Sequence, residues 1–134
     1  MTDKRNGGLR YEDLGAKMVE EFPELEDAYR KELEWWSPDE PGPHVVYGNL
    51  LNPYIIRLLE SEDSPETVQR AFDLVETLLA HEDVYVQQVA MVTVLEELQG
   101  KPEWLRLMKP HAGPLARQAV RELAQFWRGE LLEW

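Results

Sequence analysis

Apolar residues recur at helical spacing along the first 36 residues of the chain. The apolar positions of this stretch are Tyr11, Leu14, Met18, Phe22, Leu25, Ala28, Tyr29, Leu33 and Trp36. They predict one helix over 11–22 and a second from Pro23 to Trp36, because proline fits the first turn of a helix but not its interior. Residues 37–43 hold three prolines and one glycine, so we expect them to form the main loop.

The same pattern predicts further helices after the loop, bounded by capping residues and prolines. The expected segments are 44–60, broken near Asn52 by Pro53; 65–79 behind Ser64; 83–99 behind Asp83 and ended by Gly100; at most two turns between Pro102 and Pro110; and 114–128, which follows Gly113 and ends at Gly129. In the last helix the expected core stripe is Ala116, Ala119, Val120, Leu123 and Trp127. The tail over 130–134 is apolar enough to dock on the protein.

Residues 83–99 are rich in valine and threonine, so their composition also suits a strand. Length decides between the two, because about 17 residues between good stop signals exceed a typical strand. Apolar residues lie on nearly every side of the predicted helix. This distribution is typical of a central helix.

We therefore expect an all-α protein of about six helices, with a flexible N-terminus over 1–10 and one helical domain over 11–134. The helices over 65–79 and 83–99 are joined by a few residues and should be antiparallel. A pair of this size matches one unit of a helical repeat, although no consensus is shared with the other helices. An irregular bundle and a short HEAT-like solenoid both remain open.

The charge distribution is uneven along the chain. The formal net charge is −12; residues 1–100 carry −14 and residues 101–134 carry +2. Such a surface repels phosphate backbones and anionic lipid, so we expect no nucleic-acid partner and no membrane partner. It favours a basic protein partner and fast, salt-dependent association. The alternative is that the charge serves only to keep the protein soluble.

The chain has no cysteine, which excludes disulfides, thiolate metal sites and cysteine nucleophiles. Its first ten residues lack the apolar run of a secretory signal, and no stretch approaches the roughly 20 apolar residues of a membrane span. We expect a cytoplasmic protein.

Catalytic and cofactor motifs are not found, so we expect no enzyme, no cofactor and no metal. The histidines, His44, His81 and His111, lie in three different interhelix segments and lack metal-ligand spacing. His81 adjoins Glu82 and Asp83, and we interpret this group as a solvated helix cap. Serines occur only in loops or caps, and no glycine-rich phosphate loop is present.

Two adjacent tryptophans end the second predicted helix, and neighbouring helical residues point about 100° apart. If Trp36 packs inward, Trp35 points elsewhere and can anchor a partner, unless it packs under its own loop. Acidic residues of this loop and of later interhelix segments would supply the charge. The candidate partner-binding residues are Trp35, Asp39, Glu40, Glu62, Asp63, Glu82 and Asp83.

Five short motifs between Val45 and Gly129 resemble a family of small uncharacterised all-helical bacterial proteins. They are Tyr47-Gly48, Val75-Glu76, Leu95-Glu96-Glu97-Leu98-Gln99, Gly113-Pro114 and Phe126-Trp127. The resemblance implies a helical, repeat-like fold without known catalytic activity. Members of the family are similar to immunity proteins that accompany bacterial polymorphic toxins.

The leading hypothesis is a non-catalytic binding protein, an immunity protein that neutralises a basic toxin domain through its acidic surface. One alternative is a small-molecule or metal-dependent enzyme whose carboxylates converge between helices, with His81 or His111 in support. Another is a self-associating structural protein with a patch of Leu131, Leu132 and Trp134. The oligomeric state stays open.

Overall fold

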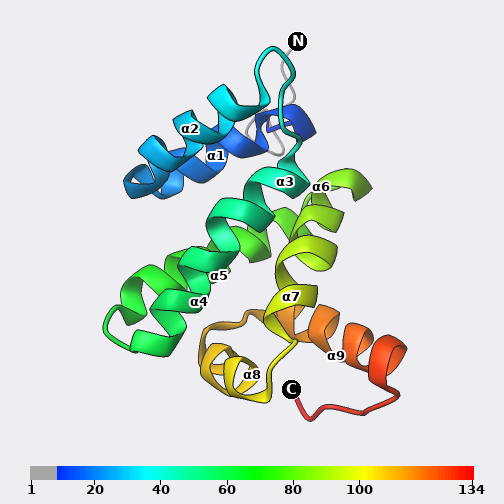
Figure 1. Ribbon diagram of the computed structural model, residues 1–134. Helices are drawn as coiled ribbons and strands as arrows, with labels where there is room; N and C mark the ends of the chain where they lie inside the picture. The colour runs from blue at the N-terminus through cyan, green and yellow to red at the C-terminus, as the bar shows by residue number, and fades with distance from the viewer. Residues whose placement is uncertain (1–8) are drawn as a thin grey trace.

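The N-terminal hairpin forms as the apolar spacing predicts. The protein is represented by a computed structural model that describes residues 9–134; most of the predicted flexible segment, residues 1–8, lies outside this range. Within it the fold is all-α and has no strand (Figure 1). The range holds seven helices if α3 with α4, and α6 with α7, are each counted as one continuous helix. Helices α1 (Leu14–Glu21) and α2 (Glu26–Trp36) lie side by side, and each follows one turn of 3-10 helix, Tyr11–Asp13 and Pro23–Leu25.

The third helix is longer than predicted and is not broken. Helix α3 (Pro43–Val46) continues through a π-helical segment, Tyr47–Leu51, into α4 (Asn52–Ser61). The prediction of a break near Asn52 is therefore wrong. A π turn is wider than an α turn, so it accommodates the Pro53 ring and its missing N–H without ending the helix.

The next two helices begin at the predicted residues. Helix α5 (Pro65–Leu79) has Ser64 at its N-cap position, where the backbone carbonyl of Ser64 accepts the first helical hydrogen bonds. Helix α6 (Val84–Gln88) continues through a second π-helical segment, Val89–Leu95, into α7 (Glu96–Leu98). The choice of helix over strand for this valine-rich segment is thus confirmed.

The C-terminal part consists of a short helix, a long helix and a docked tail. Helix α8 (Pro102–Met108) has the predicted two turns, and α9 (Pro114–Arg128) ends at Gly129, whose φ of 67° is in the left-handed region that favours glycine. The tail docks as expected, because Leu132 and Trp134 pack against the core. Arg121 also donates a hydrogen bond to the main-chain oxygen of Trp134 (2.8 Å).

One hydrophobic core connects the hairpin to the C-terminal helices, and the arrangement is a bundle. Tyr47 ties the first hairpin to the helix that follows the loop: it is fully buried and donates a hydrogen bond to the backbone carbonyl of Leu14 (2.8 Å). Helix α5 contacts α4, α6 and α9, so it lies at the centre. All candidate partner residues lie at the ends of these helices or in the connections between them.

The two π-helical segments contact each other inside this core. The Asn52 side-chain amide donates hydrogen bonds to the Thr93 carbonyl (2.9 Å) and to Glu97 Oε1 (2.7 Å). A Cβ atom added to Gly48 would lie 3.5 Å from the Thr93 methyl group, which is an ordinary van der Waals distance. Asn52 thus bonds to a carbonyl in the second π segment and links the two long helices at mid-length.

Candidate functional site

Trp35 lies in the last turn of α2 and points into solvent, with 82% of its surface exposed. It does not pack under its own loop, so this alternative is wrong. Trp36 is 38% exposed and lies at the rim, not in the core as its place in the apolar stripe predicted. It donates its indole N–H to Glu32 Oε2 (2.9 Å). The end of α2 therefore offers one freely accessible indole.

Three other tryptophans of this protein are held by glutamates, which distinguishes them from Trp35. The pairs are Trp36 with Glu32, Trp104 with Glu60 (2.9 Å) and Trp127 with Glu96 (3.2 Å). In each pair the indole N–H donates to a carboxylate, which fixes the ring. The Trp35 N–H has no acceptor among residues 9–134. Within this range no hydrogen bond restricts the rotamer of the Trp35 ring, so the ring can adjust to a partner.

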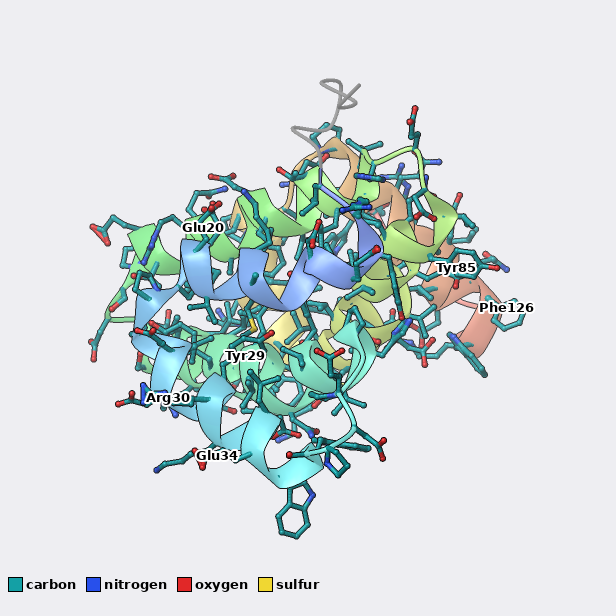
Figure 2. All side chains as sticks on the ribbon, turned by 90° about the horizontal axis from the view of Figure 1, so that it is seen from above. Glu20, Tyr29, Arg30, Glu34, Tyr85 and Phe126 are labelled. Atoms are coloured by element: carbon teal, nitrogen blue, oxygen red, sulfur yellow. The ribbon has the colours of Figure 1, made fainter. Side chains whose placement is uncertain are left out.

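The acidic loop after α2 borders a hollow of about 250 Å³ between the hairpin and α3. Its polar and aromatic walls are Tyr11, Glu12, Tyr29 and Glu40. Burial raises the pKa of the Tyr29 hydroxyl, and the negative charge of Glu40 raises it further. Figure 2 shows Tyr29 on the inner side of α2, whereas Arg30 and Glu34 lie on its outer side.

Two of these residues, Tyr11 and Tyr29, were predicted to lie in core stripes and not at a site. Both are only partly buried. The available signal was the tyrosine hydroxyl itself, which requires water or a polar partner even where the ring is covered. Glu12 carried no signal in the sequence, because its role depends on the neighbouring loop folding back toward it.

The turn between α5 and α6 lies beside the same end of the hairpin. Asp83 caps α6 as predicted, accepting the backbone N–H of Tyr85 (2.9 Å). The Tyr85 ring meets Tyr11 edge to face, at 6.3 Å between centroids, so Glu82 and Asp83 lie near the hollow. Glu82 and Asp83 therefore lie beside Tyr11, whereas Trp35, Asp39 and Glu40 belong to the end of α2 and the loop after it.

His81 in this turn is buried, so its interpretation as a solvated cap is wrong. Its Nδ1 accepts the backbone N–H of Asp83 (2.9 Å), and its Nε2 lies 3.0 Å from the Leu9 carbonyl. This pattern assigns the neutral tautomer with the proton on Nε2. His81 therefore holds Leu9 against the core.

Glu62 and Asp63 lie elsewhere. They precede α5, whereas Glu82 and Asp83 follow it, and the 15 residues of this helix span about 22 Å. The seven candidate residues therefore do not form one continuous surface. We call the end of α2 and the acidic loop after it the hairpin-end surface; its candidate residues are Trp35, Asp39 and Glu40.

Residues 9–134 hold neither a metal-binding cluster nor a membrane-spanning helix. Within residues 9–134 no three histidine or acidic side chains come together in a way that could hold a metal ion. His111 approaches Gln69 Oε1 (3.0 Å), and burial lowers the pKa of its imidazole. None of the helices in this range has the length and apolar character that crossing a bilayer requires.

The motifs that carry the family resemblance meet in pairs in the structure. The Glu76 carboxylate accepts the backbone N–H groups of Leu115 (2.6 Å) and Ala116 (3.1 Å), so it caps α9 from the neighbouring α5. A side chain on Gly113 would collide with that carboxylate at 2.6 Å. The Val75-Glu76 and Gly113-Pro114 motifs are therefore two halves of one helix cap.

The Phe126-Trp127 motif is not the buried end of a core stripe. Trp127 is 59% exposed and Phe126 is 76% exposed, so the prediction that Trp127 packs inward is wrong. Ala124 is buried instead, because α9 turns its alanines toward the core and its aromatics outward. Trp127 still meets the Leu95–Gln99 motif through its bond to Glu96.

Comparison with known proteins identifies a domain family but no characterised relative. A family model described as a domain of unknown function (DUF7674) matches residues 16–128. The match includes most of the hairpin, which the resemblance seen in the sequence left out. No curated protein and no solved structure matches the chain.

Proposed function

We propose that the chain, which belongs to the family of domains of unknown function DUF7674, is a binding module that engages a basic protein partner through its hairpin-end surface. The observation that carries this proposal is Trp35, a large apolar side chain exposed beside acidic residues. Aromatic side chains of this kind supply much of the affinity at protein interfaces, and surrounding charge sets the association rate.

The charges at this surface are available to a partner. Within the described residues, neither Asp39 nor Glu40 takes part in an ion pair, and both are exposed. A basic partner would gain from both without displacing an existing contact. Net charge of −14 over the first hundred residues extends the attraction beyond direct contact.

The partner class that best fits this chemistry is a toxin domain that acts on nucleic acid, because such domains carry basic surfaces. The chain would then be an immunity protein that covers the basic surface of the toxin without catalysis. We place the encounter in the cytoplasm, where such a toxin meets its substrate. The resemblance to immunity proteins and the acidic charge support this proposal.

The test is binding to a basic toxin domain that acts on nucleic acid, measured by stopped-flow or surface plasmon resonance. We expect the association rate to fall steeply as salt rises, because screening shortens the reach of the surface charge. Trp35→Ala should weaken binding by about 2 kcal/mol, or roughly thirtyfold in Kd, mainly through faster dissociation.

Leu131→Ala is the matched control, since Leu131 is equally exposed but lies in the C-terminal tail. It should leave the affinity unchanged. An association rate indifferent to salt, or equal effects of the two substitutions, would contradict the proposal.

A further inference from the structure

We propose that the hollow between α1, α2 and the 40–46 segment receives an arginine side chain of the partner protein. This inference rests on the proposed function and adds to it the chemistry of a second anchor beside Trp35. The hollow has a volume of about 250 Å³ and opens beside the acidic loop that follows Trp35 and Trp36.

Two tyrosine rings form aromatic walls from separate elements of the hairpin. Tyr11 comes from the turn before α1, and Tyr29 comes from α2. Tyr29 reaches its position because Gly15 leaves room for it; a side chain on Gly15 would lie 2.6 Å from the Tyr29 hydroxyl. The face of such a ring attracts a cation, and a guanidinium group can also stack on it.

Two carboxylates, Glu12 and Glu40, line the hollow from different segments of the chain. Within residues 9–134, neither is in an ion pair. Three of the four basic residues of the hairpin within residues 9–134 pair with other acids: Arg10 with Asp13, Lys17 with Glu20 and Glu21, and Arg30 with Asp27. The fourth, Lys31, does not line the hollow. The hollow thus combines aromatic walls with negative charge that the described residues leave uncompensated.

This combination selects arginine over other ligands. Carboxylate and phosphate groups would be repelled, and an apolar side chain would leave both carboxylates without a partner. A guanidinium group presents five N–H donors in one plane, so it can bond to carboxylates at its edge while a tyrosine covers its face. The raised pKa of Tyr29 agrees with this, because the Glu40 charge that disfavours a tyrosinate also favours a cation.

Two other hollows among the described residues lack this chemistry. The groove beside Trp127 and Glu96 already contains a cation, Arg128. The smaller hollow beside His111, of about 130 Å³, is lined mainly by leucine, proline and valine. Of these three hollows, the one at the hairpin end combines aromatic walls with two carboxylates that have no ion-pair partner within residues 9–134.

The test uses N-acetyl-arginine amide as the probe and N-acetyl-citrulline amide as its neutral analogue of nearly the same shape. We expect the arginine probe to shift the ring resonances of Tyr11 and Tyr29 in NMR titrations, with millimolar affinity. The citrulline probe should bind at least about tenfold more weakly. N-acetyl-lysine amide should also bind more weakly, because an ammonium group cannot bond in a plane.

Glu12→Gln and Glu40→Gln should each weaken arginine binding about fivefold. Glu34→Gln is the matched control on the outer side of α2 and should change nothing (Figure 2). Unchanged thermal midpoints would show that the variants are folded. Equal binding of arginine and citrulline, equal binding of lysine, or full binding by both glutamine variants would overturn the assignment.

Failure of this inference and failure of the proposed function give different results. If a basic partner binds and Trp35→Ala weakens it, but the arginine probe does not bind, the hollow is wrongly assigned and the binding function stands. If the probe binds at the hollow but the basic partner does not bind, the proposed function fails.

Discussion

At the scale of single residues, the carboxylate of Glu24 shows how local contacts set a charge. Burial alone would raise its pKa, but a hydrogen bond from the Tyr54 hydroxyl, a bond from its own backbone N–H and the charge of Arg70 together lower it. A carboxyl group with a lower pKa in the folded state stabilises that state above the unfolded pKa. This contribution is lost as the pH falls through the folded value.

Tyr54→Phe should therefore destabilise the protein in a pH-dependent way. The ring contact of Tyr54 with Phe22 is kept, so the loss reports on the hydroxyl. In urea unfolding, we expect the difference from wild type to be full near pH 6 and to shrink below about pH 4, near the ordinary pKa of glutamate. Tyr85→Phe, at an exposed tyrosine, should show no such trend; a constant difference for Tyr54→Phe would contradict the account.

At the scale of elements, the start of α9 depends on a side chain from α5. Glu76→Gln should cost about 1–2 kcal/mol of unfolding free energy, because an amide has one acceptor oxygen for two backbone donors and no charge for the helix dipole. Chemical denaturation measures the loss. Asp73→Asn, one turn earlier and exposed, is the control and should cost much less. Equal losses would mean that Glu76 does not act as a cap.

Helix boundaries were largely predictable because they depend on neighbouring residues. Asp83, Gly113-Pro114 and Gly129 each mark an end that the structure confirms. The continuity of the helix through Pro53 was not predictable, because a π segment depends on what packs against it.

The candidate site was predictable only in part, for a similar reason. Exposure of Trp35 followed from helical geometry, since two adjacent indoles cannot share one face. The hollow forms because the loop brings Glu40 next to hairpin residues such as Tyr29, which lie 11 or more positions earlier in the sequence. No local sequence pattern predicts this contact. The outward turn of Phe126 and Trp127 was likewise set by the packing of α9.

At the scale of the whole molecule, a second exposed aromatic cluster lies away from the acidic hairpin end. The hairpin end is acidic, whereas Phe126 and Trp127 lie in contact at the C-terminal end of α9, with centroids 4.9 Å apart, and Leu131 of the tail is also exposed. Leu132 and Trp134 pack on the core, so the self-association patch predicted with Leu131 does not form as proposed. Self-association at this end would instead use the aromatic pair.

The two kinds of association should respond to salt in opposite directions. A net charge of −12 makes copies of the chain repel, and salt screens this repulsion. We expect light scattering to show a larger average mass at about 1 M salt than at about 0.05 M salt, and Phe126→Ser to remove the increase. Equal masses under both conditions would exclude self-association through the aromatic pair.

Each π segment gives its long helix one residue that can be lost without changing the face that the later residues present. In Tyr47–Leu51 the backbone N–H groups bond to the fifth residue before them, so deleting one residue would restore the ordinary α-helical bond to the fourth. Asn52 would then keep its place opposite Thr93, whereas a deletion in the α-helical part would rotate the residues after it by about 100°. Val89–Leu95 offers the same in the second long helix, so single-residue changes in length should be tolerated best in these two stretches.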